Sequence, residues 1–328
     1  MNYQKILNNG INSLKISNII NPELDSELLL SKALNKKREK ILTNLKKEIN
    51  KKQLDKFNLY LSRRKKKEPI AYILGFKYFW KYKFFINKSV LVPRPETEQI
   101  VEETLNYLSD NESKKILDIG TGSGCIIVSV LKERSKCKAI AIDISSKALK
   151  VAKTNAKIHH LENKIKFINI DIDKFNYNKY DLILSNPPYI SNIDLIRLDD
   201  DIRIYEPRES LSGGLDGYEE ITKVIEKSSK LLKNNGKLIV EIGDTQKNNV
   251  LKLLKNNGFY INKTGKDLSG RDRCIVSTKI NNKWTTSEII TKETGLNLVE
   301  IEILEEETIM DIKSMENLIV VQNLRERI

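Results

Sequence analysis

Up to about residue 65, the chain places apolar side chains at the spacing of amphipathic helices. Examples of this spacing are Ile6, Ile11, Leu14, Leu54, Phe57 and Leu61. The pair Asn21–Pro22 has the form of a helix start, since proline is tolerated in the first turn. The pattern predicts a small all-helical domain of four or five helices over residues 1–68.

An aromatic segment follows this helical region. Residues 72–75 and 78–85 combine aromatic and apolar side chains and are bounded by Gly75 and Asn87. Such runs between turn residues are typical of a β-hairpin. We therefore assign residues 69–94 to a linker that contains a hairpin, whose aromatic rings we expect to pack between the domains.

Between residues 95 and 280, short apolar runs alternate with amphipathic stretches. The predicted strands are 115–117, 139–143, 165–170, 180–185, 237–242, 258–264 and 272–279. The predicted helices are 95–110, 123–134, 145–159, 217–234 and 246–256. This alternation predicts an α/β fold with a doubly wound sheet, whose last strand we expect to be antiparallel.

Residues 281–328 differ from the rest of the chain, because acidic residues outnumber basic ones there. Residues 285–288 have the form of a capping box, and residues 298–303 alternate like a half-exposed strand. This acidic extension could be a small added module, a partner-binding tail or a remnant of a longer fusion. The sequence leaves its role open.

A glycine-rich turn joins the first strand of the α/β region to the helix that follows. It runs Asp118-Ile119-Gly120-Thr121-Gly122-Ser123-Gly124. Such a turn lets a ligand approach the backbone and lie against the helix N-terminus. The dinucleotide-binding spacing G-x-G-x-x-G would need glycine where the chain has Cys125 or Ile127, so a dinucleotide site is not predicted.

Polar residues stand at the ends of four successive predicted strands, namely Asp118, Asp143, Asp171 and Asn186. Because parallel strands end at one edge of a sheet, we expect these residues to outline one crevice. Asp143 is placed to accept both hydroxyls of a ribose, and Asp171 to approach an adenine amino group. A single acid after a strand is more often a helix cap, but three in succession are harder to explain in that way.

The tetrapeptide Asn186-Pro187-Pro188-Tyr189 ends the fourth of these strands with a rigid turn, since neither proline can donate to the sheet. The side-chain oxygen of Asn186 and the backbone carbonyl of Pro187 could each accept a hydrogen from a planar amino group, while Tyr189 packs against it. The nitrogen of an amide or a nucleobase is such a group. The alternative is a strand-ending turn with nothing bound.

Together these motifs resemble the class I, Rossmann-like methyltransferases that use S-adenosyl-L-methionine. Within that class, the chain resembles the protein-(glutamine-N5) methyltransferases that act on peptide chain release factors. The further stretches that support the resemblance are Arg63–Gly75, Val92–Glu98, Glu206–Gly217, Glu241–Gly243 and Asp267–Arg273. The resemblance extends from residue 1 to about residue 280.

The resemblance implies a protein methyltransferase with S-adenosyl-L-methionine as its cofactor. The cofactor-binding residues would be Asp118, Gly120, Thr121, Gly122, Ser123, Gly124, Asp143, Asp171, Ile172 and Asn186. Ile172 departs from the family pattern, in which an aromatic ring can lie against the adenine. Asn186, Pro187 and Tyr189 would be catalytic, and with Pro188 they would bind the glutamine of the Gly-Gly-Gln motif of a release factor.

Three alternatives to this function remain open. The same tetrapeptide can hold the amino group of an adenine, as in adenine-N6 methyltransferases of nucleic acids. A related enzyme could act on a glutamine of a ribosomal protein, with the same chemistry and a different recognition domain. A protein that binds the cofactor or the translation apparatus without catalysis is the third.

The formal net charge of +13 on 328 residues is concentrated before residue 90, in clusters such as Arg63–Lys67. Such clusters can contact phosphate backbones. Lysine, asparagine and isoleucine are frequent along the whole chain, however, which favours solvated helix faces as their explanation. We therefore predict that nucleic acid is not required, and the sequence leaves open whether the basic N-terminal face contacts it.

Cysteine and histidine usage limits the chemistry further. Cys125, Cys137 and Cys274 are widely separated, and His159 and His160 are the two histidines, so we expect no disulfide framework, metal site or histidine nucleophile. There is no apolar run of about 18 residues, and the chain starts with polar residues. We predict a cytoplasmic protein without a membrane segment, and expect a monomer.

Overall fold

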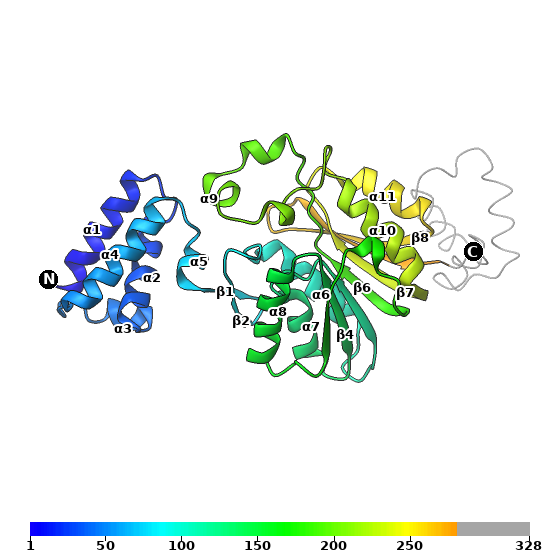
Figure 1. Cartoon of the computed structure of the whole chain (residues 1–328), viewed down its shortest axis with the longest axis horizontal. Helices are drawn as coiled ribbons and strands as arrows, with labels where there is room; N and C mark the ends of the chain where they lie inside the picture. The colour runs from blue at the N-terminus through cyan, green and yellow to red at the C-terminus, as the bar shows by residue number, and fades with distance from the viewer. Residues whose placement is uncertain (281–328) are drawn as a thin grey trace, which may run out of the picture. The chain divides into compact units, whose positions relative to one another are not determined.

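The computed structural model describes residues 1–280, in which a group of helices precedes an α/β sheet (Figure 1). The acidic extension, with its expected capping box and strand, lies outside the described residues. Residues 1–279 form one compact unit. The division into residues 1–68, 69–94, 95–280 and 281–328 therefore stays a prediction.

Helices near the N-terminus pack around a core of their own. They are α1 (Tyr3–Ile16), α2 (Pro22–Leu34), α3 (Arg38–Leu42) and α4 (Lys51–Lys65). Leu29, Leu30 and Phe57 are fully buried in this core. Arg64 Nε donates to Asp25 Oδ2 at 2.7 Å, a buried ion pair that joins α4 to α2.

The linker holds a hairpin, but part of the predicted one is helical. Residues 72–74 lie in helix α5 (Ile70–Leu74), and the hairpin consists of β1 (Phe76–Phe79) and β2 (Tyr82–Phe85). Pro69 precedes the helix, and Gly75 ends it with a φ of 82°, a left-handed conformation that glycine adopts without strain. The prediction of a strand at residues 72–75 was therefore wrong, because these two residues delimit a short helix.

Seven strands form the main sheet of the described chain. They are β3 (Lys115–Ile119), β4 (Lys138–Asp143), β5 (Ile165–Asn169), β6 (Tyr180–Ser185), β7 (Leu232–Glu241), β8 (Phe259–Lys266) and β9 (Asp272–Lys279). Their order is β5-β4-β3-β6-β7-β9-β8, and β9 is antiparallel to both of its neighbours. The predicted doubly wound α/β sheet and its antiparallel last strand are confirmed.

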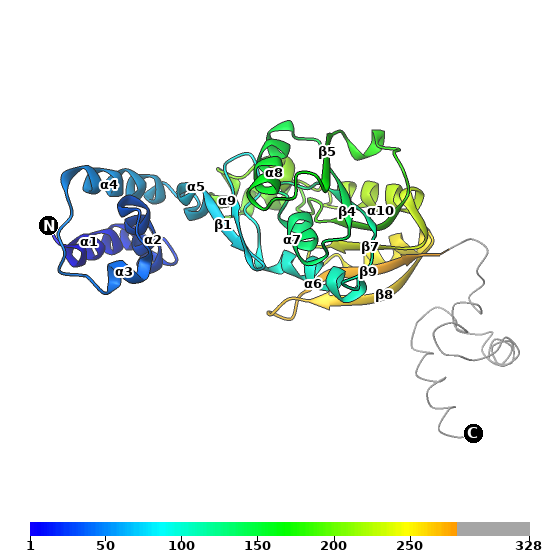
Figure 2. The ribbon, with the colours of Figure 1, turned by 90° about the horizontal axis from the view of Figure 1, so that it is seen from below.

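Helices cover both faces of this sheet (Figure 2). The first face packs against α6 (Glu98–Tyr107) and α7 (Cys125–Glu133), and the second against α10 (Glu219–Leu231) and α11 (Lys247–Asn256). Successive residues of β3 point to opposite faces of the sheet. Ile116 therefore packs in the hydrophobic core of the first face, and Leu117 in that of the second. Helix α8 (Ser146–Ile158) connects β4 to β5.

The remaining short elements surround the carboxyl ends of the strands. They are η1 (Pro95–Thr97), η2 (Ile172–Lys174), η3 (Asp194–Arg197), α9 (Asp200–Arg203) and η4 (Arg208–Ser210). The chain runs outward from β3 to β5 and then returns to β6, which pairs with β3. A crevice is expected where the direction of travel switches in this way, at the carboxyl ends of β3 and β6.

Within residues 1–280, no helix combines the length and apolar character needed to cross a membrane. The three cysteines are buried, and none of them forms a disulfide in the described part of the chain.

Gly10 offers a test of the packing between α1, α2 and α4. A Cβ at this position would lie 2.4 Å from Ser26 Oγ and 2.8 Å from Phe57 Cζ. We expect Gly10→Ala to lower the free energy of unfolding by about 1–3 kcal/mol, measured by urea denaturation. Asn12→Ala, at an exposed position of the same helix, should change it by less than about 0.5 kcal/mol. Equal midpoints for G10A and the wild type would contradict this packing.

Candidate active site

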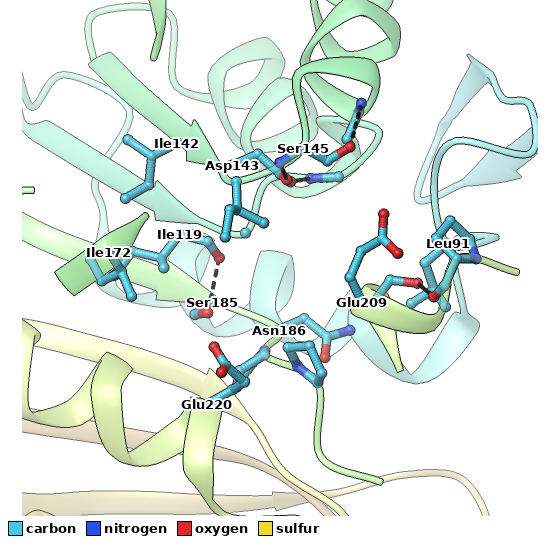
Figure 3. Close-up of a pocket in the computed structure, with 18 of the residues that line it drawn as sticks. Leu91, Ile119, Ile142, Asp143, Ser145, Ile172, Ser185, Asn186, Glu209 and Glu220 are labelled. Atoms are coloured by element: carbon cyan, nitrogen blue, oxygen red, sulfur yellow. Dashed lines mark hydrogen bonds between the residues drawn. The ribbon is translucent and has the colours of Figure 1, made fainter. Parts of the chain in front are cut away.

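A cavity of about 220 Å³ lies at the carboxyl ends of β3, β4 and β6 (Figure 3). The side chains of Asp143, Ile172, Asn186 and Glu209 surround it in the figure. The structure thus brings together Gly120, Gly122, Asp143, Asp171, Ile172, Asn186, Pro187 and Pro188 of the predicted site residues. Asp118, Thr121, Ser123, Gly124 and Tyr189 are not among the residues that line this cavity.

The first two glycines of the turn present bare backbone to the cavity. Gly120 and Gly122 have φ values of 69° and 55°, and a Cβ on Gly120 would meet no atom within 4 Å. The backbone N–H groups of Gly120 and Thr121 both donate to the Ile142 carbonyl at 3.0 Å. The turn is therefore fixed to β4, while its open side faces the space where a ligand would lie.

Two other residues of the turn, Ser123 and Gly124, support it through contacts with α8. Gly124 has a φ of 77°, and a Cβ there would lie 3.3 Å from Ala152 Cβ, so glycine allows α8 to pack close to the turn. The carbonyl of Ser123 accepts a hydrogen bond from Asn155 Nδ2 at 2.8 Å. These two residues hold the helix N-terminus in place without lining the cavity.

Asp118 is fully buried near the end of β3. Its Oδ2 accepts a hydrogen bond from Thr121 Oγ1 at 2.5 Å, and its Oδ1 has no hydrogen-bond partner among the described residues. Burial raises the pKa of this carboxyl to about 7. In this structure Asp118 anchors the glycine turn, and its expected role in binding the cofactor stays a prediction.

Asp143, at the end of β4, directs a constrained carboxylate to the cavity (Figure 3). Oδ2 accepts from the Gly122 N–H and Oδ1 from the Ser145 N–H, both at 2.8 Å. Burial raises the pKa of this carboxyl, although both backbone N–H groups act in the opposite direction. Each oxygen keeps a lone pair that could accept a hydrogen bond from a hydroxyl group.

Asp171 and Ile172 follow β5 and line the same cavity. Asp171 Oδ1 accepts from the Asp173 N–H at 3.0 Å, so this side chain also caps η2. The capping role that is common for an acid after a strand is therefore present, and it occupies one carboxyl oxygen. Ile172 is buried and gives the cavity an apolar surface beside it.

Asn186 lies where two cavities meet. Together with Pro187 and Pro188 it lines both the first cavity and a second one of about 140 Å³. Its Nδ2 donates to Thr97 Oγ1 at 3.0 Å, which leaves Oδ1 as the end of the amide that is free to bind a ligand.

The second cavity contains Tyr189, the remaining predicted site residue. The Tyr189 hydroxyl donates to Glu241 Oε1 at 3.3 Å, and burial together with this nearby carboxyl raises the pKa of the tyrosine. Arg94, which directly precedes η1, also lines this cavity, and its Nη2 pairs with Glu206 Oε1 at 2.6 Å.

Several residues that support the tetrapeptide are not assigned a role by the sequence alone. Thr97 and Glu241 lie in stretches that resemble the family, but only the structure shows that they contact Asn186 and Tyr189. Gln246 is buried, and its Nε2 donates to the Gly217 carbonyl at 2.9 Å and to the Tyr189 carbonyl at 3.2 Å. In the sequence, Gln246 is only a polar residue at the start of a predicted helix, which does not indicate that it contacts the Gly217 and Tyr189 carbonyls.

Residues 1–280 contain no group of three or more histidine, cysteine, aspartate or glutamate side chains arranged to hold a metal ion.

Two family models match the chain. The model of a methyltransferase domain matches residues 110–298, and that of the PrmC N-terminal domain matches residues 5–75. Among solved structures, a methyltransferase from Pyrococcus furiosus covers 60% of this chain, and this chain covers 89% of it, with 20% identity and a TM-score of 0.46.

Two curated relatives show how the chain compares in length. A release factor glutamine methyltransferase of Caulobacter vibrioides is 38% identical over 267 residues, which are 81% of this chain and 92% of that protein. A bifunctional methyltransferase of Rickettsia typhi is 36% identical over 297 residues, but these are 57% of its length, so the chain spans little more than half of that relative. By its identity to the Caulobacter protein and the coverage of both chains, this chain belongs to the release factor glutamine methyltransferase family.

Proposed function

We propose that this chain transfers a methyl group from S-adenosyl-L-methionine to the side-chain amide nitrogen of the glutamine in the Gly-Gly-Gln motif of peptide chain release factors. The observation that carries the proposal is the wall shared by the two cavities. Asn186, Pro187 and Pro188 line both of them. A methyl acceptor in the second cavity would therefore meet a donor in the first across this turn.

The first cavity fits S-adenosyl-L-methionine. Open backbone at Gly120 would allow the cofactor to approach the turn, and Asp143 would accept the ribose hydroxyls. Ile172 would pack against the adenine as an aliphatic surface in place of an aromatic ring, with Asp171 beside it to accept from the amino group. When bound, the cofactor supplies a methyl group that is already electrophilic because it is attached to a sulfonium.

The second cavity provides what a glutamine amide needs. Asn186 Oδ1 and the carbonyl of Pro187 would each accept one hydrogen of the amide NH₂, which orients the nitrogen and increases its electron density. The Tyr189 ring would pack against the flat amide. Its hydroxyl donates to Glu241, and the raised pKa of the tyrosine extends the pH range over which this hydroxyl stays protonated.

These residues act by alignment and by exclusion of water. Holding the two reacting groups in line replaces a bimolecular encounter, which can supply about 7–11 kcal/mol of the barrier in well-oriented systems. No strong base is required before the transfer, because the amide nitrogen gives up its proton after it has become cationic. The proposed mechanism therefore uses no histidine.

The relatives and the N-terminal match support a release factor as the partner. The Caulobacter relative is named for release factors, and the PrmC N-terminal domain match coincides with the helices near the N-terminus. These helices are our proposed recognition region. We propose that the protein acts as a monomer, and none of the proposed steps requires nucleic acid.

Asn186→Ala should separate cofactor binding from methyl transfer. We expect the dissociation constant for S-adenosyl-L-methionine to change by no more than a few-fold, and kcat to fall by roughly two orders of magnitude or more. Single-turnover transfer to a release factor and calorimetric cofactor binding would measure the two effects. Asn248→Ala, at an exposed site in α11, should match the wild type, whereas normal transfer by N186A would refute the role of Asn186.

Asp143→Asn should weaken cofactor binding instead. The amide nitrogen that replaces one oxygen cannot accept a ribose hydroxyl, and a lost hydrogen bond to a charged group costs about 1.5–3 kcal/mol, which is about a 10- to 150-fold rise in the dissociation constant. Isothermal calorimetry with S-adenosyl-L-methionine measures this directly. Asp173→Asn, at a nearby exposed position, is the control, and unchanged affinity in D143N would place the ribose elsewhere.

The acceptor is tested by methyl transfer from labelled S-adenosyl-L-methionine. The purified chain would be offered a release factor, the same factor with its Gly-Gly-Gln glutamine replaced by alanine, a ribosomal-protein fraction and duplex DNA. We expect label on the intact factor alone. Label on the ribosomal proteins or the DNA, with the factor unlabelled, would overturn the substrate while leaving the roles of Asn186 and Asp143 to be tested on the new acceptor.

A further inference from the structure

The orientation of the Asn186 amide is fixed by a residue from a different part of the chain. Thr97, the last residue of η1, is buried with 4% of its surface exposed, and its Oγ1 accepts from Asn186 Nδ2. If the amide were turned over, its NH₂ group would face the cavities and meet the N–H groups of an incoming amide, which is a donor opposite a donor. The hydrogen bond to Thr97 opposes that arrangement.

The hydroxyl of Thr97 acts on a buried carboxyl, that of Glu241 at the end of β7. Burial raises the pKa of this carboxyl to about 7, and the hydroxyl of Thr97 acts in the opposite direction. Glu241 is 2% exposed, and its Oε2 has no hydrogen-bond partner in the described part of the chain.

This carboxyl holds the other polar side chain of the tetrapeptide, that of Tyr189. Glu241 Oε1 accepts from the Tyr189 hydroxyl, and Glu241 lines the second cavity beside Tyr189 and Asn186. The charged groups that act on this carboxyl are Arg273 of β9, which favours its ionised form, and Glu96 of η1, which opposes it. Thr97 therefore binds the first residue of the turn and Glu241 the last.

We propose that Thr97 and Glu241 are positioning residues for methyl transfer, which together fix the amide orientation of Asn186 and the rotation of the Tyr189 ring. The inference rests on the proposed function and deepens it. Neither residue lines the cofactor cavity, so the pair acts on the acceptor side. Their loss should slow the transfer step while cofactor binding stays intact.

Thr97→Val tests the proposal because valine keeps the shape of threonine and removes the hydroxyl. We expect kcat for a release factor to fall at least about 10-fold, by analogy with the loss of one oriented hydrogen bond in an active site. Affinity for S-adenosyl-L-methionine should stay within about 2-fold, since Thr97 does not line the first cavity. Thr97→Ser restores the hydroxyl and should bring kcat back to within about 3-fold of the wild type.

Thr104→Val is the matched control. Thr104 is also fully buried, and its hydroxyl donates to the Ile100 carbonyl within α6, away from both cavities. Its loss should affect stability and leave kcat unchanged. If T104V and T97V reduce kcat equally, or if T97V retains normal kcat, Thr97 has a structural role and the proposal fails.

Glu241→Gln provides a second variant of nearly the same shape. Glutamine replaces one acceptor oxygen by an NH₂ group that cannot accept, so an amide turned with that group toward Tyr189 would lose the hydrogen bond from the tyrosine hydroxyl. We expect a fall in kcat with unchanged cofactor affinity, and wild-type kcat would refute the role of Glu241. Wild-type transfer to the same release factor is measured alongside, so that failure of the substrate proposal shows in the wild type itself and failure of the positioning proposal shows only in the variants.

Discussion

The hydrogen bond from Asn186 to Thr97 is the interaction on which the site depends, because it decides which atom of one amide faces two cavities. The two prolines of the turn have no backbone N–H group, so they cannot donate a hydrogen bond that would fix the orientation of the Asn186 amide. The side chain must therefore be held by residues from elsewhere in the chain. Thr97 comes from η1, just before α6, and Glu241 from the neighbouring strand β7, so two other segments of the chain complete the site.

The backbone of the tetrapeptide is held as firmly as its side chains. Gly213 and Gly217 lie so close to it that a Cβ would come within 2.9 Å of the Pro188 carbonyl and 2.6 Å of the Tyr189 carbonyl, respectively. Gln246 donates to the carbonyls of both Tyr189 and Gly217. The glycine-rich stretch after η4 therefore packs against the turn, which gives a physical reason for glycine at these two positions.

The sequence and the structure agree on most features that have a local signal. Periodicity located every strand of the main sheet, and the predicted glycine turn places Gly120 and Gly122 on a cavity. Local signals failed at residues 72–74, where aromatic content suggested a strand but the flanking proline and glycine delimit a helix. Asp118 does stand near the end of β3 with its carboxyl buried, and its predicted role in cofactor binding stays a prediction.

By itself, the sequence determined the α/β fold and the residues that reach the carboxyl edge of the sheet, because strand periodicity, glycine spacing and proline turns act over a few neighbouring positions. The tertiary structure decided which of these residues share a cavity, and it added Thr97, Glu241 and Gln246 to the support of the turn. These contacts join residues that are far apart in the chain. Only the packing of strands and loops fixes the donor and acceptor geometry between them.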